Sequence, residues 1–214
     1  MRTLNQIAHA AAILVLTVSS ASAATKLSLL KNSAFGSDPP PGGCVSGTTV
    51  LPQWAVSTGS IDILSDVTAC GSIVPPRSEY FLNLTGGADT GAGTISQSAA
   101  TTIGTLYILT FSFGGDPEWQ TGCLGSGNVN DGPTKSMNVL VSGSVPITAN
   151  YTIDTTGLAC TDPGWTFEGI FFTATSTTTT VTFQSLDTTG VYGPVLAAVK
   201  LVATNNTETG DVEQ

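Results

Sequence analysis

Residues 80–113, YFLNLTGGADTGAGTISQSAATTIGTLYILTFSF, decide the fold class of this chain. Large apolar side chains occupy every second position at both ends of the stretch, first Tyr80, Leu82 and Leu84, then Tyr107, Leu109, Phe111 and Phe113. A period of two is typical of half-buried β-strands. The Gly-rich residues 86–93 and residues 99–104 flank a short middle strand around Ile95. We therefore expect three consecutive strands, joined by short polar connections, in one sheet.

The sequence on both sides of this stretch continues the same pattern. Further strands are expected at residues 25–31, 51–57, 60–64, 135–141, 144–152, 165–174, 178–185 and 195–203. Residues 165–174 and 178–185 are predicted to form a β-hairpin. About ten strands with frequent turns and no amphipathic helix predict an all-β fold, an antiparallel β-sandwich of jelly-roll type.

The first 23 residues indicate the compartment. Arg2 precedes an apolar run, and Ala21-Ser22-Ala23 matches the cleavage site of a secretory signal peptide. The run is too short for an ordinary transmembrane helix, although an uncleaved anchor is the alternative. We expect a signal peptide at 1–23, a single sandwich domain at 24–204, a disordered polar tail at 205–214 and a secreted or cell-surface protein without a membrane span.

Charge excludes one class of partner. Charged residues are 10% of the chain, and removal of Arg2 leaves five Lys and Arg against fifteen Asp and Glu, a net charge of −10. Such a surface repels phosphate backbones, so no nucleic-acid partner is expected.

The four cysteines predict two disulfides, because an even number in an exported chain favours bridges over free thiols. Three pairings are possible, and we favour Cys44 with Cys70 and Cys123 with Cys160. A zinc site is the alternative, but the chain has no CxxC spacing and no histidine after His9.

Seven segments in order resemble the choice-of-anchor C family, which is related to the domain-of-unknown-function proteins of plant cell walls. They are an Asn-x-x-Phe at Asn32, a Trp-initiated strand before GSIDIL, then YFLNLTGG, GTISQS, GTLYILTFSF, GWTFEGIFFTATSTTTTVTFQSL and GPVLAAVKLV. The resemblance covers nearly all of the mature chain. It implies a galactose-binding-like jelly roll that is exported, has no enzymatic activity and associates with cell-surface or cell-wall polysaccharide.

Two acidic positions of that family are missing here. The resemblance places a Glu where Gly36 follows Phe35, and an Asp-Asn pair in the last strand where this chain reads Leu196-Ala197-Ala198-Val199. In related jelly rolls such acids hold a structural calcium ion. A hard-cation site without its carboxylates binds poorly, so we expect no metal or other cofactor.

The candidate ligand-binding residues lie in loops. Trp119 stands in a Gly-rich loop near several carboxylates and amides, an environment suited to stacking on a sugar ring and hydrogen bonding to it; covering a disulfide is the alternative role for Trp119. Trp54 and Trp165 are expected to pack in the sheets. The predicted set of ligand-binding residues is Asp116, Glu118, Trp119, Asn130, Asp131 and Tyr192.

Catalysis by these acids is a third-ranked alternative. A glycosidase needs two carboxylates on opposite sides of the scissile bond, and solvated loop acids are far commoner. The absence of a mature histidine excludes Ser-His-Asp and Cys-His mechanisms. Glycosylation sequons begin at Asn83, Asn150 and Asn205.

These observations give two leading hypotheses of different classes. The first is a secreted, non-catalytic carbohydrate-binding or cell-wall-associated module whose ligand is a polysaccharide or glycan. The second is a structural surface or matrix protein whose strand edges and Thr-rich faces bind protein neighbours.

Overall fold

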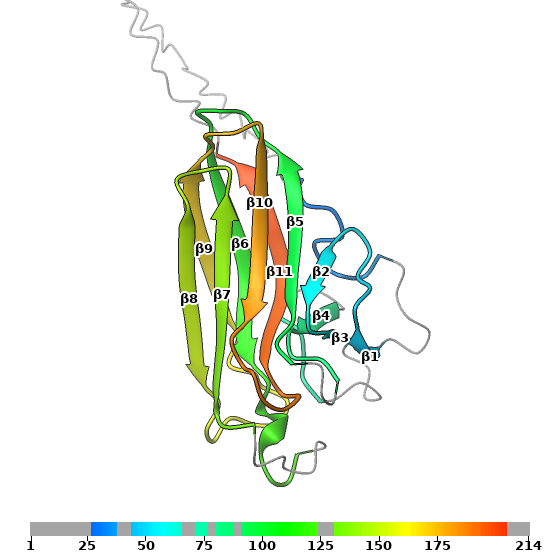
Figure 1. The fold of residues 1–214 in the computed structure, drawn as a ribbon. Helices are drawn as coiled ribbons and strands as arrows, with labels where there is room; N and C mark the ends of the chain where they lie inside the picture. The colour runs from blue at the N-terminus through cyan, green and yellow to red at the C-terminus, as the bar shows by residue number, and fades with distance from the viewer. Residues whose placement is uncertain are drawn as a thin grey trace, which may run out of the picture.

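A computed structural model describes residues 27–37, 44–65, 72–76, 80–87, 91–123 and 131–204. The predicted signal peptide, Cys70, Asn130, Asn205 and the predicted tail lie outside these ranges. The described chain forms two antiparallel sheets that lie one behind the other (Figure 1), which confirms the predicted all-β jelly-roll sandwich. No helix in the described ranges has the length and hydrophobicity needed to cross a membrane.

The six-stranded sheet has the order β1-β3-β4-β11-β6-β9 and the five-stranded sheet the order β2-β5-β10-β7-β8. The strands of the first sheet are β1 (Val45–Thr48), β3 (Ile61–Ser65), β4 (Tyr80–Asn83), β6 (Leu106–Gly115), β9 (Thr166–Thr173) and β11 (Pro194–Ala203). The second sheet contains β2 (Ala55–Thr58), β5 (Thr94–Ala100), β7 (Thr134–Ser142), β8 (Ile147–Asp154) and β10 (Thr178–Ser185).

Two predictions of strand pairing were wrong. The stretch 80–113 does not form one three-stranded sheet, because β4 and β6 both pair with β11 while β5 pairs with β2 and β10 in the other sheet. The predicted β9–β10 hairpin is absent for the same reason, since β9 pairs with β6. A period of two fixes which side chains face the core, whereas the partner of a strand depends on where its connection crosses between the sheets.

The core confirms the predicted facing of the strands. Every second residue of β6 is buried between the sheets, and Phe111 contacts Phe183 of β10 and Tyr151 of β8 at ring-centroid distances of 5.3 and 5.2 Å. Trp54 is 6% exposed and lies between Phe35 and Phe183. A packing role for Trp54 is therefore confirmed.

Residues 27–37 lie beside β11, and the described part of the predicted strand at 25–31, residues 27–31, is not a strand. The Leu29 N–H donates to the Leu201 carbonyl, and the Val199 N–H donates to the Ser33 carbonyl. Asn32 then turns the chain: its carbonyl accepts from Phe35 N–H at 3.1 Å and from the Trp54 indole N–H at 3.2 Å.

The two positions where the resemblance places acidic residues have their own local structure. A Cβ at Gly36 would lie 2.9 Å from the Tyr80 ring, so the ring occupies the space of a side chain there. Ala198 has a φ of 51° at a register shift of β11 against β6. Left-handed φ values suit Asn or Gly better than Ala. The expected absence of calcium stays a prediction.

Candidate functional site

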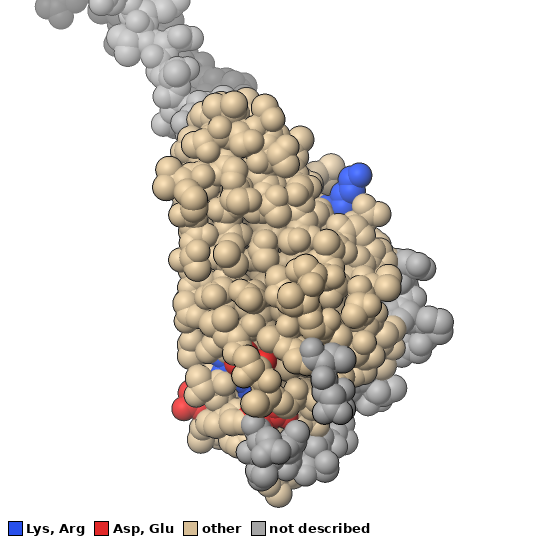
Figure 2. Space-filling view, in the orientation of Figure 1, with Lys and Arg blue, Asp and Glu red and all other residues tan. Residues whose placement is uncertain are grey.

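The connections at one end of the sandwich bring most of the predicted ligand-binding residues together. We call this region the loop end. It comprises residues 116–123, which include the 3-10 helix η1 (Pro117–Trp119), and residues 131–133, 155–164 and 187–193. On the face seen in Figure 2, acidic and basic side chains gather at the lower end, while the surface above is almost free of charge.

Asn83, which the sequence analysis missed as a functional residue, holds the loop end together. It is 1% exposed, and its amide nitrogen donates to Asp116 Oδ2 at 2.9 Å and to the Val191 carbonyl at 3.0 Å. Its Oδ1 accepts from Thr85 N–H at 2.9 Å and from Gly193 N–H at 3.2 Å. The two backbone donors fix the orientation of the amide.

Asp116 is the most strongly perturbed acid of the site. Its carboxylate is 3% exposed, and Oδ1 accepts from Glu118 N–H at 2.9 Å, which caps η1. Burial raises the pKa of this carboxyl to about 7, and the neighbouring Glu118 charge acts in the same direction. The hydrogen bonds from Glu118 N–H and Asn83, and the Lys135 charge, oppose this rise.

Glu118 and Trp119 attach η1 to the neighbouring loops. Glu118 Oε1 accepts from the backbone N–H and the hydroxyl of Ser72 at 2.7 and 2.8 Å. The Trp119 indole N–H donates to Thr155 Oγ1 at 2.7 Å, and Thr155 Oγ1 donates to the Pro133 carbonyl. The half-buried Trp119 ring is thus held in a fixed orientation.

Lys135 is a buried cation beneath the same loops. It is 1% exposed, and its ammonium donates to the Asp131 carbonyl at 2.8 Å. Burial lowers the pKa of Lys135, whereas the charges of Asp187, Asp131 and Asp116 raise it. Burial likewise raises the pKa of Asp187 to about 6. One oxygen each of Asp131 and Asp187 is buried without a hydrogen-bond partner in the described chain, so the Lys135 charge is their main compensation.

Tyr192 adjoins the predicted acids. Its ring is half buried, and the pKa of its phenol is raised by burial and by the negative charges of Asp116, Glu118, Asp131 and Asp62. Asp131 Oδ2 accepts from the N–H of Val191 at 3.1 Å, which attaches the loop before β11 to the start of β7. Gly190 is required there, because any side chain at that position would meet the Asp131 carboxylate.

One predicted disulfide is present at the loop end. Cys123 and Cys160 are bonded, with Cα atoms 5.5 Å apart, and the bridge links the loop after η1 to the loop after β8. Cys44 is also disulfide-bonded. Its pairing with Cys70 stays a prediction, because Cys70 lies outside the described ranges.

Five of the six predicted ligand-binding residues are therefore described, and the sixth, Asn130, is not. Asp116, Glu118, Trp119, Asp131 and Tyr192 share the loop end, but the three acids are 3–8% exposed and form internal hydrogen bonds. The residues missed were Asn83, Lys135 and Asp187. Asn83 and Lys135 lie within strand patterns, and a polar residue inside a strand is the signal that could have indicated them. No group of three His, Cys, Asp or Glu residues in the described chain is arranged to hold a metal ion.

The chain belongs to the family described as "Protein of unknown function (DUF642)", which matches residues 28–202. This match confirms the predicted relation to a domain-of-unknown-function family. Membership of the choice-of-anchor C family stays a prediction. No curated protein matches the chain.

Solved structures of similar fold include several carbohydrate-binding modules. The structure of TmCBM61 in complex with β-1,4-galactotriose is 17% identical, with a TM-score of 0.51, and the match covers 84% of this chain and 100% of that one. CBM35 from Paenibacillus barcinonensis is 15% identical, with a TM-score of 0.39, and the match covers 75% of this chain and 98% of that one. The K1 adhesin domain of Lys-gingipain from Porphyromonas gingivalis is 13% identical, with a TM-score of 0.47 and coverage of 76% and 98%. At these identities the likeness shows the fold alone.

Proposed function

We propose that this protein is a secreted, non-catalytic carbohydrate-binding module associated with a cell wall or cell surface, and that its ligand contacts the loop end. The observation that carries the proposal is the position of two half-buried aromatic rings, Trp119 and Tyr192, on connected loops beside a group of carboxylates. Aromatic faces and nearby polar groups are the two elements that a sugar-binding site combines.

The buried acids support this site and do not themselves contact the sugar. Asp116 caps η1, and Glu118 holds Ser72, so both carboxylates keep the loop that carries Trp119 in place. A ring that is already fixed loses little conformational entropy when a ligand stacks on it. The ligand-contacting surface is then formed by the exposed parts of Trp119 and Tyr192.

A binding role fits the acids better than hydrolysis does. Two catalytic carboxylates must flank a glycosidic bond at roughly 5–10 Å. Asp116 instead accepts a hydrogen bond from the backbone of Glu118, and both carboxyl groups are at least 90% buried. Neither acid is therefore disposed to protonate a leaving group on a bound polysaccharide.

β-1,4-Galactotriose is the first probe, because the TmCBM61 structure that shares this fold contains that sugar. The oxidised protein without residues 1–23 is titrated with it by calorimetry and is then sedimented with insoluble cell-wall polysaccharides. We expect one of these glycans to bind, and Trp119→Ala and Tyr192→Ala each to weaken binding roughly five- to 150-fold, about 1–3 kcal/mol per stacked ring.

Phe171→Ala is the matched control, because Phe171 is an aromatic residue of β9 with 62% exposure that lies outside the loop end. Its removal is expected to leave binding unchanged. Trp119→Phe separates the ring from the indole N–H that bonds Thr155. Unchanged binding in both Trp119→Ala and Tyr192→Ala, with intact thermal unfolding, contradicts the proposed site, and absence of binding to every glycan contradicts the function.

A further inference from the structure

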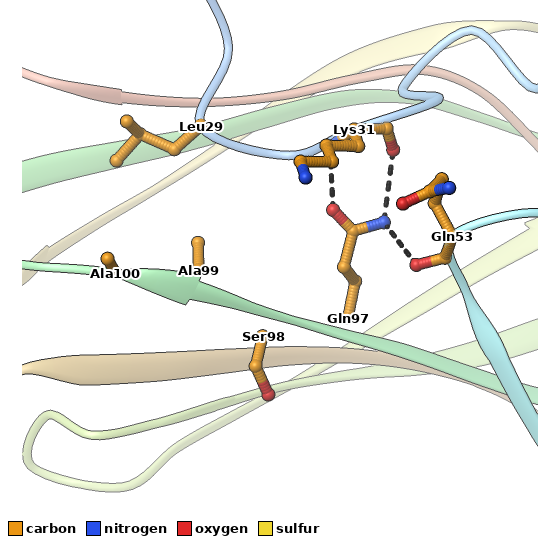
Figure 3. A pocket seen from close by; sticks show the side chains of 7 residues that line it. All are labelled: Leu29, Lys31, Gln53, Gln97, Ser98, Ala99 and Ala100. Carbon is orange, nitrogen blue, oxygen red and sulfur yellow. Dashed lines mark hydrogen bonds between the residues drawn. The ribbon is translucent and has the colours of Figure 1, made fainter.

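A second cleft lies away from the loop end, between residues 29–31 and strand β5. Its volume is about 380 Å³, and it is lined by Leu29, Lys31, Gln53, Gln97, Ser98, Ala99 and Ala100. Figure 3 shows Leu29 and Lys31 on one side and the β5 residues on the other, with the Gln97 side chain reaching across. We call this cleft the β5 slot.

The β5 slot exists because β2 covers only the first half of β5. β2 pairs with β5 at Thr94, Ile95 and Ser96, while the pairing of β10 on the other edge continues to Ala100. Two residues before β2, Gln53 has a φ of 71°, and this left-handed residue directs the chain away from the line of the strand. A strand continuing that line would occupy the slot.

The backbone of β5 presents unused hydrogen-bonding groups to the slot. In an antiparallel ladder, alternate residues bond to opposite neighbours. The Ser185 N–H donates to the Gly93 carbonyl and the Thr101 N–H donates to the Thr177 carbonyl, so the odd residues bond to β10. The N–H and C=O groups of Ser98 and Ala100 therefore point to the open edge, where no described residue pairs with them.

The side-chain amide of Gln97 closes one end of the slot, because it makes hydrogen bonds of the kind that the backbone of a neighbouring strand makes. Its Oε1 accepts from Lys31 N–H at 2.6 Å, and its Nε2 donates to the carbonyls of Lys31 at 3.0 Å and Gln53 at 2.8 Å (Figure 3). The primary amide thus makes the donor–acceptor pair that a neighbouring strand would offer to Lys31. Beyond Gln97, toward Ala100, the edge is open.

We propose that the β5 slot binds an extended peptide segment of another protein by strand addition to Ser98 and Ala100. Residues i and i+2 of the segment exchange N–H···O=C bonds with Ser98 and Ala100, which are also two positions apart and roughly 6.6–6.8 Å from each other along the strand. This proposal does not depend on sugar binding at the loop end.

The lining residues specify the side chains of the segment. Ala99 faces the core and is 6% exposed, so the peptide residue opposite it also points inward, toward Ala99 and Leu29, and must be aliphatic. Lys31 is the one charged side chain among the seven lining residues. An acidic side chain on the peptide segment complements the Lys31 charge. Such a charge pair at the exposed rim of an interface mainly increases the association rate.

Unprotected edges of this kind are uncommon. Natural sheets shield edge strands with Pro, inward-pointing charges, bulges or covering loops. Residues 97–100, Gln-Ser-Ala-Ala, contain neither Pro nor charge, and their pairing with β10 is regular. The slot therefore retains the geometry that a peptide strand needs.

The test selects a phage-displayed random heptapeptide library on the oxidised protein and on Ala100→Pro. Proline removes the N–H of residue 100 from the open edge and leaves the β10 ladder intact. Ala100→Thr is the matched control that keeps the N–H, and thermal unfolding verifies that each variant folds. We expect wild type and Ala100→Thr to select peptides with an aliphatic residue near an acidic one, bound at least tenfold more tightly than by Ala100→Pro.

Hydrogen exchange of the selected peptide complex gives the second readout. The amides of Ser98 and Ala100 are expected to exchange rapidly in the free protein and to become protected on binding, and Lys31→Gln is expected to weaken binding two- to fivefold at low salt. The proposal is overturned if Ala100→Pro selects the same peptides equally well, or if no peptide is selected. It is also overturned if self-association or β-1,4-galactotriose, and not a peptide, protects these amides.

Discussion

The loop end and the outer face of the five-stranded sheet are both polar, yet they are built in opposite ways. The outer face is formed by the outward side chains of β5, β10, β7 and β8, which include Leu140 and Ala100 but are mostly polar: Ser96, Ser98, Thr180, Thr182, Gln184, Asn138, Ser142, Thr148, Asn150 and Thr152. Among the outward positions of these strands only Asp154 is charged. The loop end instead buries Asn83, Asp116, Asp131 and Lys135 at 1–3% exposure.

The difference teaches where polar groups determine structure. On the outer face, pairs such as Ser98 with Thr180 and Asn138 with Asn150 bond at 2.7 and 3.2 Å, but water replaces either partner when it is removed. At the loop end the polar groups are buried, so the loss of one partner leaves the other without a hydrogen bond. Buried polar groups therefore fix the loop geometry, whereas exposed ones add little to a sheet that the core already stabilises.

The largest effect expected of a single substitution is that of Asn83→Ala. The substitution leaves Asp116 Oδ2, the Val191 carbonyl and two backbone N–H groups buried without their partner. We expect a loss of at least about 3 kcal/mol in the free energy of unfolding, measured by urea denaturation. A loss below about 1 kcal/mol would show that the loop end is as hydrated as the outer face.

The pH dependence of stability sharpens the same comparison. Because the folded-state pKa of Asp116 is about 7 and its ordinary value is 3.8, the folded state binds this proton more tightly than the unfolded state. The contribution of Asp116 to the free energy of unfolding is therefore fully present below about pH 4 and is lost as the pH rises to 7, a change on the order of 4 kcal/mol for this group. Urea denaturation between pH 4 and 8 measures, as a slope, how the free energy of unfolding changes with pH.

Asp116→Asn is the control for that slope. The variant has no ionisable group at residue 116, so its stability is expected to vary less with pH, whatever its absolute stability. The remaining decrease is assigned to Asp187, whose pKa burial raises to about 6, and to Asp62, whose pKa burial also raises. A slope identical to that of the wild type contradicts the assignment to Asp116.

A smaller and stabilising effect is expected at the register shift of β11. Ala198→Gly relieves the left-handed φ of 51° and should raise the free energy of unfolding by up to about 1 kcal/mol. Ala197→Gly, at the neighbouring buried position, should instead lower it by about 1 kcal/mol, because it removes a packed methyl group and adds unfolded-state entropy. Equal effects of the two changes would refute strain at residue 198.

The smallest effect is expected on the outer face itself. Asn150→Ala breaks the hydrogen bond between Asn150 and Asn138 at an exposed edge strand and should change the free energy of unfolding by less than about 0.5 kcal/mol. Compared with Asn83→Ala, it removes the same amide from the opposite environment. Urea denaturation of both variants at the same pH and temperature measures the ratio of their losses in the free energy of unfolding.

The fold class could be predicted from residues such as Phe111 and Phe183, because the period of two records which side chains are buried. The pairing of strands could not. β4, β5 and β6 follow one another through short connections, and nothing in residues 86–93 or 99–104 indicates that β5 belongs to the opposite sheet. The strand β1 was missed because Val45–Thr48 contains Gly47 and lacks an apolar alternation.

The candidate site was predicted as a group of loop residues but not as a network. The clustering of Asp116, Glu118 and Trp119 is visible in the sequence, since they are adjacent. Their connection to Asn83 and Lys135 depends on strands that are distant in the sequence and meet only in the folded sheets. The sequons show the same limit of sequence-based prediction, because a sequon does not reveal whether its asparagine is accessible. The structure buries Asn83, whereas Asn150 is exposed.

The position of β11 has a consequence for the way the chain folds. The strand is the last one described along the chain, yet it lies in the middle of its sheet, between β4 and β6, and also binds residues 29–33. Most of its partners are far away in the sequence, an arrangement that slows folding. The six-stranded sheet cannot close during synthesis until residue 203 has emerged. If the chain is exported, as the sequence predicts, this late closure would leave the six-stranded sheet unformed while residues before β11 are being synthesised.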